Sequence, residues 1–413
     1  MKYREFIALN CLHFLVDAYA SLYGLIAATV RLSPATIGYV GTAFSLAANA
    51  SQLLMGVLAD RRDLRGFIVV GSMTAAVFVP LAGLFADVPG VFPIALILGG
   101  LGVAAFHPPG AVVSGRLGKH RATFFVGIFV TVGSMGFASG PALFTMFTET
   151  LGFERSYLLI LPGLVMATIA FGTFGRRKDS FAPSRSTRWS LSEARELLHD
   201  HGSKILPLFL CVVARSVIFL TVAFYLPTIL IARGETRADA SFGHFMFCAA
   251  GCLGTMVVGA LVGKVNRRWL QVASLVLGVP AGMLFLYPGV PTYVNYLGLI
   301  VCGLTSLSTN AMHVVMGQEI SRDHASTLSS LMMGFGWGIG GLASALTGRL
   351  VEPLGLEMAT GVTIALALLA LPLVIFLEPF PQTARTAEPD SVEDSVTPAL
   401  SDAPEAAGRA GSG

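Results

Sequence analysis

Apolar residues run along this chain in twelve long segments, and clusters of polar residues separate them. A helix rises about 1.5 Å per residue, so roughly twenty residues cross a hydrocarbon core of about 30 Å. The pattern therefore predicts twelve membrane-spanning helices. They cover roughly residues 5–30, 35–59, 66–86, 90–115, 122–148, 155–175, 204–232, 238–263, 269–288, 291–318, 325–348 and 355–378.

The composition agrees with this pattern. Of the 413 residues, 54% are hydrophobic and only 12% are charged, whereas a soluble domain carries about 25% charged residues. The net charge of +3 is too small to indicate a nucleic-acid partner. The first apolar segment resembles a signal peptide, but its length, the acid Asp17 within it and the many similar segments that follow indicate an uncleaved first span.

Lysine and arginine gather in alternate loops, which predicts the orientation. With an even number of spans, the N-terminus, the polar stretch 176–203 and the loops near residues 60–65, 116–121 and 264–268 share one side, and they hold most of the basic residues. Cytoplasmic loops carry the excess of Lys and Arg. We therefore expect a multi-pass protein of the plasma (inner) membrane with both termini in the cytoplasm.

The two halves of the chain show traces of a repeat. Gly99 matches Gly303, and His120 matches His324, at one common spacing. Repeated six-span units that rock about a central site are typical of secondary transporters. We predict an all-α membrane protein of two pseudo-symmetric six-helix bundles, residues 1–175 and 204–378. A cytoplasmic connector, 176–203, joins them and holds a short amphipathic helix that either lies on the membrane or only tethers the halves. The cytoplasmic tail, 379–413, should be disordered.

Two polar residues lie inside the first span. A carboxylate at mid-bilayer costs roughly 2.5–3.5 kcal/mol on apolar scales, so Asp17 must face a wet cavity or the bundle interior. His13 is four residues earlier and shares its helix face. Because histidine titrates near neutrality, we predict that His13 and Asp17 couple transport to protons. A static hydrogen-bonded pair is the alternative.

Further polar residues interrupt the apolar spans. Arg215, in the seventh span, must pair with a carboxylate such as Asp17, bind an anionic substrate or belong to a static ion pair. His107 precedes Pro108 and Pro109, which should kink its helix, so we expect His107 on the cavity wall. Asn310 and His313, in the tenth span, are further candidates for the cavity wall. Gln52 and Tyr225 either line the cavity or serve packing.

One loop and one span resemble motifs of the major facilitator superfamily. The loop from Gly56 to Arg65 resembles the signature G-x-L-x-D-R-x-G-R-R/K but has Asp63 in place of its second glycine. We expect Asp60, beside Arg61 and Arg65, to form a charge network that locks the cytoplasmic closure of the transporter. The fifth span resembles the exporter motif G-x-x-x-G-P, although small-residue packing is the alternative interpretation. Its residues are Gly136, Gly140 and Pro141.

A closer resemblance lies in the fourth span. Phe106-His107-Pro108, together with His13 and Asp17, is similar to the fosmidomycin-resistance-type efflux branch of that superfamily, over residues 5–378. The branch has an acidic or amide residue where Pro109 stands here. The resemblance implies a major facilitator fold and proton-driven efflux of a drug or an anionic metabolite.

The expected function is a secondary active transporter, a proton-coupled exporter of a small drug or metabolite, with an anionic compound as one option. Alternatives are a facilitator or uptake carrier, a metal-ion exporter that uses His13, Asp17 and His107, and a non-transporting receptor. The sequence holds no nucleophile–base set, no phosphate-binding glycine loop and no metal-ligand spacing, so we expect no enzyme, no catalytic residue, no cofactor and no resident metal. The expected partners are a small-molecule substrate, protons and the lipid bilayer, with the protein a monomer.

Overall fold

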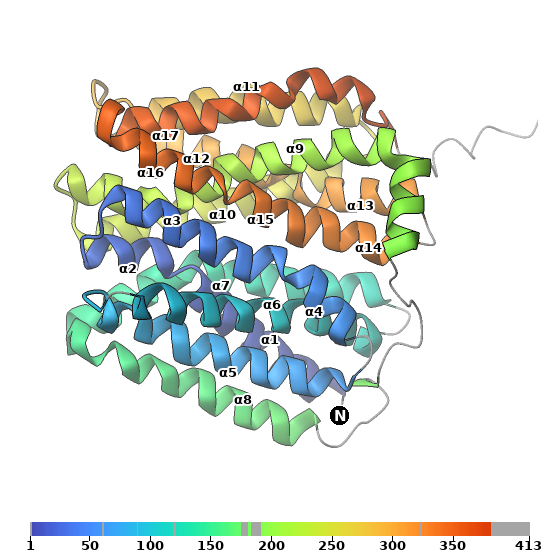
Figure 1. Ribbon diagram of the computed structural model, residues 1–413, viewed down its shortest axis with the longest axis horizontal. Coiled ribbons are helices and arrows are strands. Elements are labelled where there is room, and N and C mark those ends of the chain that lie inside the picture. The colour runs from blue at the N-terminus through green and yellow to red at the C-terminus, as the bar shows by residue number, and fades with distance from the viewer. Residues whose placement is uncertain are drawn as a thin grey trace, which may run out of the picture. The chain divides into compact units, whose positions relative to one another are not determined.

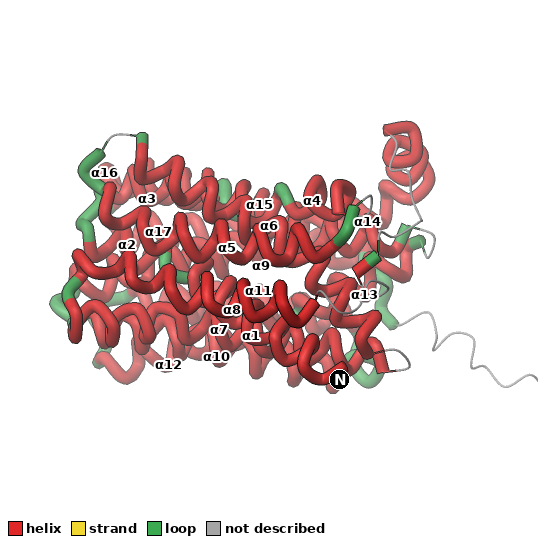
Figure 2. Tube along the Cα trace, turned by 90° about the horizontal axis from the view of Figure 1, so that it is seen from below, coloured by secondary structure: helices red, strands yellow, loops and turns green. Residues whose placement is uncertain are grey.

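The structure is a computed structural model that describes residues 2–59, 62–88, 90–118, 121–174, 181–182, 191–321 and 324–380. Residues 1–381 form one compact unit, and its described ranges are helices and the turns that join them. Figure 2 shows the long helices running along a common direction, with the N-terminus at one end of the bundle.

The first six predicted spans form the N-terminal half (Figure 1). Its elements are α1 (Lys2–Ala20), α2 (Tyr23–Thr29), α3 (Pro34–Ser45), the π-helical turn η1 (Leu46–Ala50), α4 (Gln52–Ala59), α5 (Leu64–Ala82), η2 (Gly83–Phe85), α6 (Val91–Gly118), α7 (Ala122–Leu151), η4 (Phe153–Leu159) and α8 (Ile160–Phe174).

The remaining spans form the C-terminal half. Its elements are α9 (Leu191–Ala232), α10 (Arg237–Leu261), α11 (Arg267–Leu286), α12 (Thr292–Ser308), α13 (Asn310–Ile320), α14 (Ala325–Ser330), the π-helical turn η6 (Leu331–Phe335), α15 (Gly336–Gly340), α16 (Ala343–Leu354), α17 (Leu356–Ala365) and η7 (Leu366–Phe376).

Among the described residues, eleven helical segments are long and apolar enough to cross a membrane. The predicted eleventh span, 325–348, is helical but is interrupted by the π-helical turn η6 and by a turn after α15. Its five glycines between residues 334 and 341 explain the interruption, because glycine in a helix costs about 1 kcal/mol relative to alanine. The fold class is the predicted one.

Local capping explains where several helices begin. The Thr236 hydroxyl accepts the backbone N–H of Asp239, and the Asp239 carboxylate accepts the Thr236 N–H, which forms a capping box at α10. The Asp63 carboxylate accepts the Arg65 N–H at the start of α5. Gly152 and Gly355 end α7 and α16 with φ of 93° and 80°, a conformation that only glycine adopts without strain.

The connector differs in part from the prediction. Residues 191–203 belong to the continuous helix α9 and are not a separate surface helix. In Figure 1 the first turns of α9 stand across one end of the bundle before the helix turns into it. Most of the predicted connector and tail lie outside the described residues, so the boundaries between bundles, connector and tail remain a prediction.

The two halves are joined at the end opposite the N-terminus, on the left in Figure 1. The Tyr225 hydroxyl of α9 lies 3.0 Å from the carbonyl oxygen of Pro34 and 2.9 Å from that of Ser344. Nearby, the Arg349 Nε donates to the Tyr39 hydroxyl over 2.7 Å. These contacts tie α3 to α9 and α16, and we name them the seal. Tyr225 belongs to the seal.

Candidate functional site

A cavity of about 190 Å³ lies between the two halves. Its wall is mostly apolar, with a few polar side chains, as in small-molecule sites generally. The N-terminal half contributes Asp17, Ala20, Phe44, Ala48, Asn49, Gln52, Val103, His107, Ser134 and Phe137. The C-terminal half contributes Phe219, Leu220, Phe224, Cys248, Cys252, Leu307, Asn310, Met333 and Trp337.

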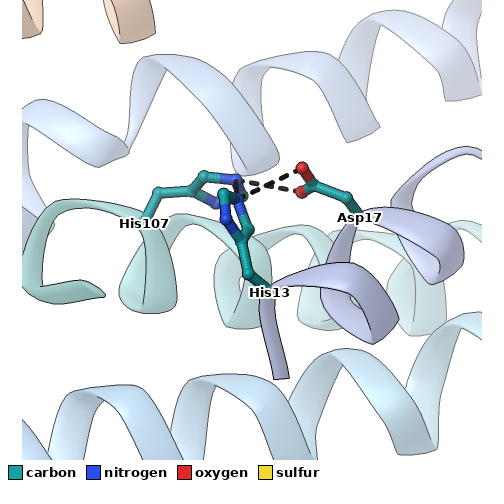
Figure 3. Close-up of side chains that lie close together, drawn as sticks. All are labelled: His13, Asp17 and His107. Carbon is teal, nitrogen blue, oxygen red and sulfur yellow. Dashed lines mark hydrogen bonds and ion pairs between the residues drawn. The ribbon is translucent and has the colours of Figure 1, made fainter. Parts of the chain in front are cut away.

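The Asp17 carboxylate faces two neighbouring histidine rings on this wall (Figure 3). The Nε2 of His13, one helical turn earlier on α1, lies 3.2 Å from Asp17 Oδ2. The Nε2 of His107, on α6, lies 3.0 Å from Asp17 Oδ1, and the two Nε2 atoms are 3.4 Å apart. The predicted pair of His13 and Asp17 is thus a cluster of three, which we name the His–Asp–His cluster.

The other ring nitrogen of each histidine is already engaged. His13 Nδ1 lies 2.8 Å from the Phe129 carbonyl oxygen, and His107 Nδ1 lies 2.8 Å from that of Val103. A carbonyl oxygen only accepts, so both Nδ1 atoms must carry their proton. In neutral rings both Nε2 atoms then present lone pairs to the carboxylate, which repels them. The cluster is therefore satisfied only when it holds an additional proton or another cation.

The glycines of α7 make room for this cluster. A methyl group at Gly133 would overlap the His13 ring and the Asp17 carboxylate, and one at Gly136 would overlap the backbone oxygen of Phe14. Gly140 faces the backbone of α1 in the same way. The small residues of the exporter-like motif thus pack α7 closely against α1, as the packing interpretation expects.

The two prolines after His107 leave α6 continuous but remove two helical donors. A residue's N–H normally bonds to the carbonyl four residues earlier, so Pro108 and Pro109 leave the carbonyls of Ala104 and Ala105 without their usual partners. The His107 ring faces the cavity one residue before this break. The helix is locally weakened where it carries one arm of the His–Asp–His cluster.

Arg215 is fully buried and has neutral partners. Its NH1 lies 3.4 Å from the Ser306 carbonyl oxygen, its NH2 lies 3.2 Å from Ser216 Oγ, and the Trp337 ring covers it at 4.7 Å. Among the described residues no carboxylate forms an ion pair with Arg215. The bridge to Asp17, one of the alternatives for Arg215, is not formed in this structure, where the two histidines bond Asp17.

The energy balance at Arg215 is unfavourable. A desolvated cation–π contact contributes about 2 kcal/mol, whereas burying an ion costs several kcal/mol. The partners seen here therefore leave part of the cost of burying this charge uncompensated.

The remaining candidates divide between the cavity and its surroundings. Asn310 and Gln52 line the cavity. His313 is buried outside the lining and donates its Nε2 proton to Gln271 Oε1 over 2.7 Å. Tyr225 lies in the seal described above. Sequence reasoning missed the aromatic and sulfur-containing lining residues, although Trp337 stands inside the glycine-dense eleventh span that signals close packing.

Around the signature loop, part of the prediction lies outside the described residues, namely Asp60 and Arg61. Gly56 packs near Pro108, and Arg65 pairs with Asp63, the residue that replaces the signature's second glycine. The Arg65 guanidinium holds the pKa of the Asp63 carboxyl below its usual range. This pair caps α5.

In the C-terminal half, the region that corresponds to the signature loop contains a different ion pair. Buried Arg267 bonds Glu319 through both guanidinium nitrogens, at 2.6 and 3.0 Å.

Comparison with known proteins gives the same picture of the fold. The chain is 25% identical to the fosmidomycin resistance protein of Escherichia coli (strain K12) over 393 residues, 90% of this chain and 91% of that protein. It is 23% identical to the uncharacterized MFS-type transporter YfnC of Bacillus subtilis (strain 168), over 93% of this chain and 94% of that one.

Solved transporters share the architecture at low identity. The crystal structure of the nucleoside transporter NupG matches 91% of this chain and 98% of its own with a TM-score of 0.73 at 15% identity. A POT family transporter matches 91% of this chain and 94% of its own with a TM-score of 0.71. The sequence profile of the Major Facilitator Superfamily matches residues 6–345. The chain therefore belongs to the Major Facilitator Superfamily of membrane transporters.

Proposed function

We propose that this transporter exports a small compound in exchange for protons, and that the His–Asp–His cluster is its proton site. The observation that carries the proposal is the convergence of two Nε2 lone pairs and a carboxylate on the wall of the central cavity. Such a cluster binds a proton readily and is strained without one.

The location of the cluster suggests how proton binding acts on the helices. His13 and Asp17 belong to α1, whereas His107 belongs to α6 beside its two prolines. A proton shared between His107 and Asp17 joins the two helices. Its loss leaves the Nε2 lone pair of His107 facing the Asp17 carboxylate at 3.0 Å and the Nε2 lone pair of His13 at 3.4 Å. Loading and unloading the proton then biases the packing of α1 against α6, as alternating access requires.

Export is the direction that the relatives favour. The Escherichia coli relative is named for fosmidomycin resistance, and extrusion of a toxic compound is one way in which a membrane transporter confers resistance. We further propose cytoplasmic termini in the inner membrane, on the distribution of basic residues, and a monomer as the working unit.

Two experiments in sequence test the proposal. A susceptible host that produces the protein is first screened against toxic compounds to find one that it tolerates better. Everted membrane vesicles with a respiration-driven pH gradient then receive that compound, and a pH-sensitive dye reports whether proton efflux follows. We expect the compound to dissipate the gradient with the wild-type protein and with Asp87→Asn, whose carboxylate is exposed in a loop, but not with Asp17→Asn.

Gradient dissipation that survives in Asp17→Asn would refute the proton site. A tolerated compound whose transport leaves the pH gradient untouched in the wild-type protein would refute proton exchange itself.

Divalent-metal transport is the second candidate. The ligand atoms of His13, Asp17 and His107 all lie within 4.8 Å of one another, and two imidazoles with a carboxylate suit a transition-metal ion. Zinc uptake into everted vesicles, measured with an internal zinc dye and abolished by Asp17→Asn, would favour this candidate. Zinc flux equal to that of vesicles without the protein would exclude divalent-metal transport.

A further inference from the structure

A second polar cluster lies in the C-terminal half, separate from the His–Asp–His cluster. Four buried polar atoms there have no hydrogen-bond partner among the described residues. They are Arg215 Nε, Gln271 Nε2, Thr309 Oγ1 and His313 Nδ1. Buried polar atoms are nearly always paired. Unpaired atoms also occur elsewhere among the described residues, for example Thr221 Oγ1 and Ser344 Oγ, but this group includes a fully buried guanidinium that has no carboxylate partner among the described residues.

The orphaned atoms come from helices that pack together. Arg215 on α9 reaches the Ser306 carbonyl at the end of α12, and α9 also packs against α13, which carries His313. Gln271 on α11 accepts the His313 Nε2 proton, and the His313 backbone N–H bonds to the carbonyl of Thr309. We name these four residues the arginine cluster.

The chemistry of the arginine cluster selects an anion. Three of the four atoms are donors: the Arg215 guanidinium and the Gln271 amide offer unused N–H groups, and the Thr309 hydroxyl offers an O–H. His313 Nδ1 is an acceptor while Nε2 donates to Gln271, so it is not counted among the donors to an anion. No described carboxylate pairs with Arg215. The planar guanidinium fork matches the two oxygens of a carboxylate, phosphate or phosphonate, which makes an oxyanion the fitting ligand.

Trp337 separates this cluster from the cavity. Its ring lies over the Arg215 guanidinium at 4.7 Å and also lines the cavity, whereas Arg215 itself is fully buried and outside the lining. Phe219 contacts the indole edge to face with centroids 5.2 Å apart. Trp337 lies in α15 directly after the π-helical turn η6, and such turns are frequent at functional sites.

We infer that Arg215 is the anion subsite of the transport cavity and that the Trp337 indole is its cover. The oxyanion of the exported compound displaces the indole, pairs with the guanidinium and takes up the unused donors of Gln271 and Thr309. This inference rests on the proposed export function, because it names the class of compound that the cavity receives, a small carboxylate, phosphate or phosphonate.

Trp337 provides a direct readout. The chain has two other tryptophans, Trp189 and Trp269, and replacing both with phenylalanine leaves Trp337 as the only tryptophan. The purified single-tryptophan protein is titrated with acetate, methylphosphonate and inorganic phosphate at constant ionic strength, and with neutral acetamide as the matched control. We expect a saturable change in Trp337 emission with at least one oxyanion and none with acetamide.

The oxyanion that binds with the highest affinity identifies the headgroup class. Arg215→Gln is expected to weaken that binding at least roughly tenfold. A linear response to every anion, or the same affinity in Arg215→Gln, would overturn the inference. If that variant does not fold, Arg215→Lys is measured in its place. Loss of the two-donor guanidinium fork should weaken oxyanion binding several-fold, and an unchanged affinity would refute the role of the fork.

The two proposals fail separately. Asp17→Asn in the single-tryptophan protein should keep the oxyanion response while it loses proton exchange in vesicles. A normal oxyanion titration with no proton movement in the wild-type protein would reject the export proposal alone. Proton exchange that persists with a tolerated compound while Trp337 ignores all three oxyanions would reject the anion subsite alone.

Discussion

Replacing Gly133 with alanine should uncouple this transporter from the pH gradient without unfolding it. Gly133 lies in the middle of α7 and is buried against α1. An added methyl group would meet the His13 ring and the Asp17 carboxylate, both side chains that can move. The expected result is a displaced His–Asp–His cluster on an intact helix.

The size of the effect follows from the contacts that the methyl group breaks. A hydrogen bond to a charged group contributes about 1.5–3 kcal/mol, and His13 and His107 each make one to Asp17 when protonated. Losing either contact lowers occupancy of the proton-bound cluster roughly 10- to 100-fold, at about 1.4 kcal/mol for each factor of ten. The alanine itself favours the helix by about 1 kcal/mol, so fold stability should change little.

The same helix offers two matched controls. A methyl group at Gly127 would meet nothing within 4 Å, so Gly127→Ala should leave both stability and transport unchanged. A methyl group at Gly136 would meet the Phe14 backbone, which cannot rotate away, so Gly136→Ala should push the helices apart and lower the unfolding temperature. Dye-reported gradient dissipation in everted vesicles and thermal unfolding in detergent are measured for all three variants.

Two results would contradict the reasoning. Full proton exchange in Gly133→Ala would mean that the cluster tolerates the methyl group or that it does not carry the proton. A fall in the unfolding temperature equal to that of Gly136→Ala would mean that Gly133 serves helix packing rather than the cluster.

Three further predictions concern the rest of the bundle. Glu319→Gln should destabilise the protein by about 3–5 kcal/mol, seen as a lower unfolding temperature, because buried Arg267 loses its carboxylate. Tyr225→Phe removes a hydroxyl that joins the halves, worth about 0.5–1.5 kcal/mol, and should widen the distance distribution between spin labels on the two halves. Asp63→Ala should cost about 1 kcal/mol at neutral pH through the lost cap of α5. Because Arg65 lowers the Asp63 pKa, this difference should shrink as the pH falls below the ordinary aspartate value of 3.8.

Each of these variants has a control. Glu352→Gln alters an exposed acid and should not change the unfolding temperature. The spin labels for the tyrosine test are placed on cysteines at positions 87 and 352, both exposed, and an unchanged distribution would exclude Tyr225 from the seal. If the loss of unfolding free energy in Asp63→Ala stays constant down to pH 2, the ionised carboxylate is not the form that stabilises the fold.

The helical architecture could be read from the chain because the information is local. The length of each apolar run sets whether it can span a membrane, and the spacing of His13 and Asp17 sets their shared helix face. The interrupted eleventh span is also local in origin, since its glycines weaken the helix. The continuity of α9 through residues 191–203 was not predicted, because a polar stretch can extend a helix outside the apolar region.

The partners of the buried charges were decided by the tertiary structure. The sequence allowed Asp17 to pair with Arg215. In the structure, α6 packs against α1 so that Asp17 pairs with His107, and Arg215 contacts Trp337 and neutral oxygens. Tyr225 joins the halves at their sealed end, and Glu319 pairs with Arg267. Periodicity within one helix fixes which residues share a face. The rotation and depth of each helix against its neighbours depend on many weak contacts between distant segments, and these decide which faces meet.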